Sequence, residues 1–143
     1  MPEPTNAALP RGAIARAAAQ KVADRGNGNR TTPLIMPGSG TTQMINGITV
    51  IAPQSAIQEH FHNCEESILI LEGQAIAVID GEQHMLTAPD ASWVAAGVPH
   101  YFQNASATEP LKIFWTYASV TATRTNVATG ETRPIAAEHV GSR

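Results

Sequence analysis

His60 and His62 stand one residue apart, and the carboxylate of Glu66 follows four positions later. A third histidine, His100, comes later in the chain. Imidazole nitrogens and a carboxylate oxygen are a natural ligand set for a divalent transition metal. Residues i and i+2 of a β-strand point to the same face, so a strand would present the first two imidazoles together. These four side chains therefore predict a metal centre built on strands.

The elements that must position these ligands are predicted to be short strands with turns between them. Hairpin signals occur at Asn46-Gly47, Glu72-Gly73 and Asp80-Gly81. Many short strands with regular turns and no intervening helix indicate an antiparallel sandwich or barrel. The expected strands cover residues 31–36, 41–45, 48–52, 57–62, 67–71, 75–79, 84–87, 92–94, 100–103, 111–117 and 121–125.

A different pattern precedes the strands. Residues 10–24 are rich in alanine, with Ile14, Ala18 and Val22 at helical spacing and Pro10 at a position that a first turn tolerates. This predicts a short N-terminal helix, ended by the Gly and Asn residues of segment 25–29. We therefore expect a helical arm over residues 1–30, a barrel over 31–125 and a weakly structured C-terminal tail over 126–143.

Composition narrows the class of protein. The 143 residues are 43% hydrophobic and 15% charged, as expected for a globular chain rather than a disordered one. A net charge of -3 gives no basic surface for nucleic acid, and no apolar run reaches the length of a membrane span. Cys64 is the single cysteine, which excludes an internal disulfide. The N-terminus lacks the order of a signal peptide, so we expect a cytoplasmic location.

Two spacings carry a family resemblance, His60-x-His62-x3-Glu66-x6-Gly73 and Gly97-x2-His100-x3-Asn104. They resemble the two consensus motifs of the cupin superfamily, and the resemblance covers roughly residues 41–118. Three turn positions depart from the family pattern. The opening glycines of the motifs fall on Gln54 and Pro89, and the motif proline falls on Ala95.

The resemblance implies an antiparallel double-stranded β-helix, the jelly-roll barrel of cupins. It also implies that His60, His62, Glu66 and His100 are the metal ligands. Iron or manganese is favoured, although this ligand set also suits Ni, Co, Cu and Zn. Four protein ligands on an octahedral ion leave about two positions open, which is typical of a catalytic site rather than a structural one. By the same resemblance, Glu66 could alternate between ligand and proton acceptor.

Five residues are expected to line a substrate pocket. Phe102 shares strand phase with His100, and Gln58 shares phase with His60 and could orient its ring. The other three are Met44, Ile48 and Trp115. Alternation places Trp115 on the same face as Ile113 and Tyr117, and it does not decide whether that face points inward. Arg30 and Arg124 are arginines that could clamp a carboxylate, although exposed arginine is the commoner case.

The resemblance favours an iron(II) or manganese(II) dioxygenase that acts on an enol, diketone, phenol or thiol substrate. One alternative keeps the metal without dioxygen, as an isomerase, decarboxylase or lyase. A second alternative is a small-ligand binding or sensing module without turnover. Fold alone does not separate these functions. The expected partner is a small-molecule substrate, with neither nucleic acid nor membrane, and the family suggests a homodimer.

Overall fold

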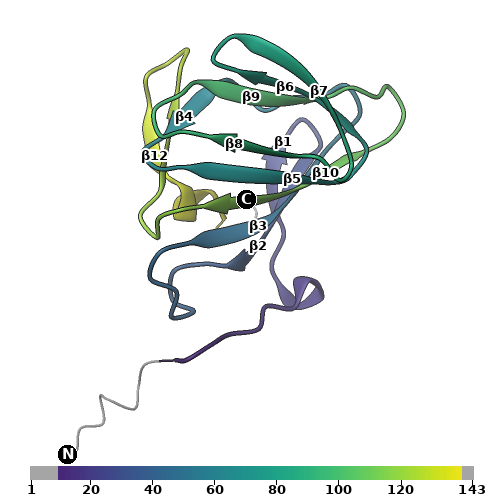
Figure 1. The fold of residues 1–143 in the computed structure, drawn as a ribbon. Coiled ribbons are helices and arrows are strands. Elements are labelled where there is room, and N and C mark those ends of the chain that lie inside the picture. The colour runs from purple at the N-terminus through teal and green to yellow at the C-terminus, as the bar shows by residue number, and fades with distance from the viewer. Residues whose placement is uncertain (1–9, 140–143) are drawn as a thin grey trace, which may run out of the picture.

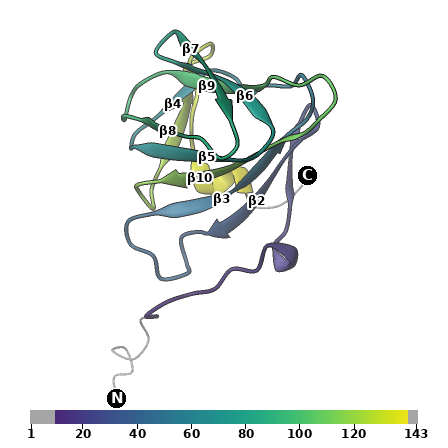
Figure 2. The same cartoon turned by 45° about the vertical axis from the view of Figure 1, so that its right-hand side comes forward.

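The computed structural model describes residues 10–139, which form two six-stranded antiparallel sheets packed face to face (Figures 1 and 2). This is the jelly-roll architecture that the motifs predict. The first sheet has the order β1 (Ala23–Gly26), β2 (Asn29–Ile35), β3 (Ile45–Ile51), β10 (Leu111–Tyr117), β5 (Glu66–Glu72) and β8 (Ala91–Val94). The second has the order β12 (Thr132–Pro134), β11 (Thr123–Asn126), β4 (His60–His62), β9 (His100–Asn104), β6 (Gln74–Ile79) and β7 (Glu82–Thr87).

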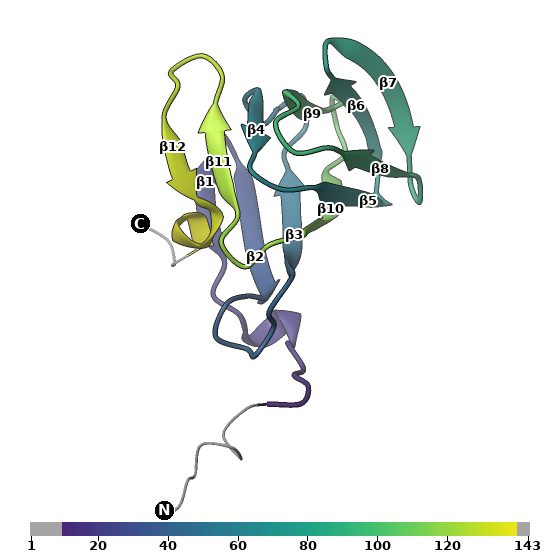
Figure 3. The same ribbon diagram turned by 60° about the vertical axis from the view of Figure 1, so that its left-hand side comes forward.

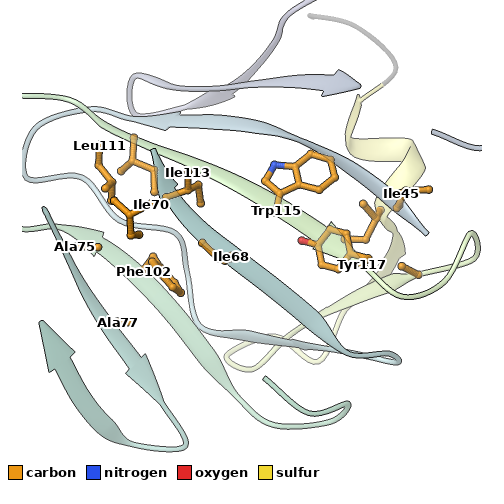
Figure 4. Packing of buried hydrophobic residues seen from close by; sticks show 13 residues of the cluster. Ile45, Ile68, Ile70, Ala75, Ala77, Phe102, Leu111, Ile113, Trp115 and Tyr117 are labelled. Atoms are coloured by element: carbon orange, nitrogen blue, oxygen red, sulfur yellow. The ribbon is translucent and has the colours of Figure 1, made fainter. Parts of the chain in front are cut away.

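The core lies between the sheets and follows the two-residue period of the strands (Figure 4). In β10 every second residue is buried, and this set includes Ile113, Trp115 and Tyr117. That inward face is the one that alternation by itself left undecided. Phe102 of β9 packs into the same cluster from the opposite sheet. The inner faces of these strands therefore supply both the core and the walls around the metal ligands.

The predicted helix over residues 10–24 is wrong. Only Ala17–Ala19 form a 3-10 turn, η2, and Ala23–Gly26 join the first sheet as strand β1. Ile14 is 79% exposed, so the Ala-rich segment has no apolar stripe to bury, and tertiary burial supplies most of the stability of short helices. Asn27 and Gly28 take positive φ angles of 55° and 81° in the turn that joins β1 to β2. Residues 1–9 of the expected arm lie outside the described residues.

Of the three turn signals, Asp80-Gly81 is confirmed as the tight turn between β6 and β7. Glu72-Gly73 is a turn as well, but it carries the chain from one sheet to the other. The Asn46-Gly47 prediction is wrong, because both residues lie inside β3. The glycine there makes room for Trp115, whose ring lies where a Cβ would be. Residues 41–44, expected as part of a strand, are loop.

The described part of the C-terminal segment closes one side of the barrel. Residues 132–134 pair with β11 as β12, and Ile135–His139 form a 3-10 helix, η3. Ile135 is fully buried and its N–H donates to the carbonyl of Ala122 at 2.9 Å. Figure 3 shows η3 beside β1 and β2, which it contacts. Within residues 10–139, no helix has the length and hydropathy needed to cross a bilayer.

Candidate metal centre

The two motifs bring four ligand side chains together inside the barrel. His60 and His62 point inward from β4, and His100 of β9 lies directly opposite His60 in the antiparallel pair. Glu66 is the first residue of β5 and reaches the same point from the opposite sheet. All four residues are at most 4% exposed. Their ligand atoms lie within 4.8 Å of one another, so they can face one ion.

Each imidazole is oriented by its Nδ1 atom, which donates to a backbone carbonyl. His60 bonds to the carbonyl of Gln58 at 2.6 Å, His62 to that of Thr123 at 3.0 Å and His100 to that of Val98 at 2.9 Å. A carbonyl only accepts, so the proton of each neutral ring is on Nδ1. The Nε2 lone pairs are therefore free to bind a metal.

Gln58, expected to orient His60, does so through its main chain. Its side-chain oxygen accepts a hydrogen bond from Nδ2 of Asn126 at 2.7 Å. This leaves the Gln58 side chain on the pocket wall rather than against the imidazole. Alternation identified the right residue, but it carries no information on which group of that residue makes the contact.

The lone pairs at the centre face one another with no donor between them. Oε1 of Glu66 lies 2.9 Å from Nε2 of His100 and 3.2 Å from Nε2 of His62. Since Nδ1 already holds the proton of each neutral ring, these contacts bring acceptors together. Nε2 of His62 is buried without a hydrogen bond among the described residues. Such a cluster is stabilised when a cation lies between its acceptors.

Distances at the site also fit a metal ion. Imidazole nitrogens and carboxylate oxygens bind first-row ions at about 2.0–2.2 Å, which puts neighbouring octahedral ligands about 3 Å apart and opposite ones about 4.2 Å apart. The contacts of 2.9 and 3.2 Å to Glu66 match the neighbouring separation. The widest separation in the set, 4.8 Å, exceeds the opposite one by a fraction of an ångström. The donor set therefore fits a single divalent ion with small side-chain adjustments.

Electrostatics keep the ligands in their metal-binding forms. Burial, helped by the positive charge of Arg124, holds the pKa of His60 well below its usual range. In the metal-free site, burial alone would raise the pKa of Glu66, but His100 and His62, when both nitrogens of each ring are protonated, supply hydrogen bonds and positive charge that outweigh burial and bring that pKa well below its usual range. A neutral His60 and an ionised Glu66 are the forms that donate electron pairs to a metal.

A cavity of about 320 Å³ opens beside the ligands. His60 and His100 form part of its wall, and so do three residues that were expected to line a substrate pocket: Gln58, Phe102 and Trp115. Met44 and Ile48, also expected as walls, do not line this cavity. Met44 is 48% exposed in the loop before β3. Ile48 alternates with Gly47 and Thr49 and so points to the outer face of the sheet.

Several residues around the cavity were not predicted from the sequence as site residues, among them Tyr117, Arg25 and Glu138. Tyr117 packs its ring against His62, with centroids 4.6 Å apart, and its hydroxyl hydrogen-bonds with Glu66. Burial, together with the negative charge of Glu66, raises the pKa of Tyr117 well above its usual value, so the hydroxyl stays protonated. Its shared phase with Trp115 was the signal that could have identified it.

Of the two arginines considered as clamps, Arg124 lines the cavity and Arg30 is exposed elsewhere. His84 is half-exposed beside Glu82, away from the ligands. Cys64 is partly buried next to the core, and burial raises the pKa of its thiol. A thiol held protonated is a poor ligand and nucleophile.

Comparison with known sequences places this site in context. Residues 47–117 match the family described as a cupin domain. The HTH-type transcriptional regulator PuuR of Escherichia coli is 31% identical over 91 residues, 61% of this chain and 41% of that protein. The tetracenomycin polyketide synthase protein TcmJ of Streptomyces glaucescens is 30% identical over 79 residues, 54% of this chain and 53% of that protein. The chain thus spans about half or less of the length of these two relatives.

Solved structures share the fold at low sequence identity. The polyketide cyclase RemF of Streptomyces resistomycificus has a TM-score of 0.68 at 17% identity, covering 87% of this chain and 85% of that one. The Mn(II)-containing oxalate decarboxylase of Bacillus subtilis has a TM-score of 0.69 at 18% identity, over 78% of this chain and 31% of that one. Salicylate 1,2-dioxygenase of Pseudoaminobacter salicylatoxidans has a TM-score of 0.59 at 16% identity, over 67% of this chain and 26% of that one.

Proposed function

Because this chain belongs to the cupin superfamily, we propose that it is a metal-dependent enzyme acting on a small molecule. The most favoured activity is that of an iron(II) or manganese(II) dioxygenase on an enol, diketone, phenol or thiol. One observation carries the proposal. His60, His62 and His100 all commit Nδ1 to backbone carbonyls, the Nε2 atoms of His62 and His100 face the carboxylate of Glu66, and one ligand atom of each of the four buried residues lies within 4.8 Å of the others.

Each side chain has a distinct role in this proposal. A bound divalent ion would act as a Lewis acid on a substrate oxygen and, if it is redox active, assist electron transfer to dioxygen. The three histidines hold the ligand geometry rigid through the backbone. Glu66 would alternate between metal ligand and acceptor of the proton that an enol or phenol loses, and Tyr117 donates a hydrogen bond that steadies this carboxylate. Apolar walls such as Phe102 exclude bulk water.

Fold neighbours support this choice of metal and chemistry. The oxalate decarboxylase contains Mn(II), and the salicylate enzyme is a dioxygenase. Both resemble this chain below 25% identity, so they support the reaction class by analogy of fold alone. A site of three imidazoles and one carboxylate suits either ion, since each accepts nitrogen and oxygen ligands in an octahedral arrangement.

A second candidate keeps the metal and omits dioxygen, as in a lyase, isomerase or decarboxylase. It is favoured by RemF, a polyketide cyclase that is covered over most of its length, and by TcmJ, a polyketide synthase protein. A third candidate, a ligand-sensing module without turnover, is favoured by PuuR, a transcriptional regulator.

Anaerobic purification followed by metal analysis and oxygen uptake tests these candidates. We expect about one iron or manganese per chain and oxygen consumption that matches the loss of an enolic or phenolic substrate. Loss of substrate without oxygen consumption would favour the second candidate. Binding of a small molecule with no turnover across the panel would favour the third. Protein that holds no divalent metal after reconstitution would refute the proposal.

A further inference from the structure

Three charged side chains from remote parts of the chain meet on the pocket wall: Arg25 of β1, Arg124 of β11 and Glu138 of η3. Arg25 lies 3.3 Å from Oε1 of Glu138, and Nε of Arg124 lies 3.0 Å from Oε2 of the same carboxylate. One carboxylate thus bridges two guanidinium groups. The side chains are 26%, 17% and 8% exposed for Arg25, Arg124 and Glu138, so solvent screens their charges only in part.

The cluster is neither neutral nor fully hydrogen-bonded. Two arginines against one glutamate leave a net charge of +1 on the pocket wall. Nε of Arg124 and Oε1 of Glu138 are buried without a hydrogen bond among the described residues, although the ions touch. Since each guanidinium has five N–H donors, Glu138 leaves most of this donor capacity for another acceptor. By contrast, Arg133 and Glu131 form a neutral and well-exposed pair at the pocket edge.

The cluster also lies next to the metal ligands. Arg124 pairs with His62 across the β11–β4 ladder, and its side chain hydrogen-bonds with Tyr117. Tyr117 in turn hydrogen-bonds with Glu66. One small molecule in the cavity of about 320 Å³ could therefore contact both the arginines and the metal centre.

We propose that Arg25 and Arg124 bind the carboxylate of the substrate, which makes the substrate a small enolic or phenolic acid. This inference rests on the proposed metal-dependent function. A carboxylate accepts paired N–H donors from guanidinium groups in a geometry that a neutral group does not match. The arginine cluster carries +1, and a divalent ion with the Glu66 carboxylate also carries +1. An acid ionised at its carboxylate and at its enol or phenol oxygen would balance both charges.

Matched probes test this inference by isothermal titration of the metal-free and Mn(II)-loaded protein. The first pair is para-hydroxybenzoate and para-hydroxybenzyl alcohol, and the second is acetoacetate and acetylacetone. We expect at least one acid to bind about tenfold more tightly than its neutral partner, as one charge-assisted contact implies. The substitution Arg25→Gln should reduce this preference to roughly twofold or less. The control Arg30→Gln removes the same charge from an exposed position on β2 and should leave the preference unchanged.

The substitution Arg124→Lys keeps the charge and loses the planar fork of the guanidinium. It should lower the affinity for the acid probe several-fold, while the circular dichroism spectrum stays native. Equal affinity for acid and neutral partners, no binding by either acid at millimolar concentration, or an unchanged preference in Arg25→Gln would overturn the inference. Metal content is measured on the same samples. A protein that binds Mn(II) but shows no acid preference refutes this inference alone, whereas one that binds no metal refutes the proposed function.

Discussion

Replacing Gly47 by alanine should destabilise the wall between β3 and its neighbours. Gly47 is opposite Trp115 in the β3–β10 pair. An added Cβ would meet Cζ2 of Trp115 and would lie 2.7 Å from its Cη2 atom and 2.7 Å from the carbonyl oxygen of Thr32. That oxygen belongs to the backbone of a paired strand, and the buried indole donates its Nε1–H to Thr49 at 2.9 Å. Neither neighbour can move without breaking other contacts.

The magnitude follows from these two clashes. Overpacking a well-packed core costs about 1–3 kcal/mol per site, and Gly47 meets rigid atoms on both sides. Alanine is intrinsically better than glycine in a strand by about 0.5–1 kcal/mol, which offsets part of the loss. Because both neighbours are rigid, we take the upper part of the overpacking range and expect a net loss of about 2 kcal/mol in the free energy of unfolding. At about 2–4 °C per kcal/mol for a chain of this size, the melting temperature should fall by roughly 4–8 °C.

Urea unfolding followed by tryptophan fluorescence measures this loss. A Trp93→Phe background removes the exposed tryptophan, so that only the buried Trp115 reports. Gly12→Ala is the control, because a Cβ at Gly12 meets nothing within 4 Å. Surface changes of that kind lie within about 0.5 kcal/mol of zero. If Gly47→Ala loses no more unfolding free energy than Gly12→Ala, the close packing of Trp115 is not the reason why position 47 needs a glycine.

Three other outcomes are expected. The substitution His62→Ala removes one of the four candidate ligands and should lower the metal retained after dialysis by at least about tenfold, measured by elemental analysis. His84 is half-exposed and away from the ligands, so the control His84→Ala should retain as much metal as the unmodified protein. Because burial lowers the pKa of His60 in the folded state, the unfolded chain binds a proton first as pH falls below about 6.5. The metal-free protein should then lose up to about 1.4 kcal/mol of unfolding free energy per pH unit between pH 6.5 and 5. The substitution His60→Gln should flatten this slope. An equally steep slope in His60→Gln would contradict the assignment of the pH dependence to His60. Gln54 holds a φ of 62°, so Gln54→Gly should change stability by less than about 1 kcal/mol, in the direction of a gain, and a larger loss in urea unfolding would contradict the strain argument.

The ligand set was predictable because its spacing is local. His60 and His62 are two residues apart, so any strand brings them to one face, and Glu66 begins the strand that follows. The second motif adds His100 at the start of β9, directly opposite His60. Strand alternation likewise placed Phe102 in phase with His100, but it left open whether the face of Trp115 points into the pocket. A period of two residues carries the information for His60, His62 and Phe102, whereas His100 came from the resemblance of the second motif.

Two errors show where local patterns fail. The alanine-rich segment before Ala23 has helical spacing, but Ile14 remains exposed and β1 instead pairs with β2. Asn46-Gly47 has the composition of a hairpin turn, yet Gly47 is a strand residue whose missing side chain accommodates Trp115. Propensity is a weak preference, and the pairing of backbone groups and the burial of a large ring outweigh it.

The sequence by itself predicted an antiparallel sandwich or barrel, because the strand period acts over a few residues. Its resemblance to the cupin motifs implied the jelly-roll fold and the four side chains that could hold a metal. Only the tertiary structure decided what surrounds the site. Arg25, Arg124 and Glu138 come from opposite ends of the chain and share no spacing that could link them. They meet because β1 and η3 pack together beside β11, so the contact depends on the closure of the barrel rather than on any local pattern.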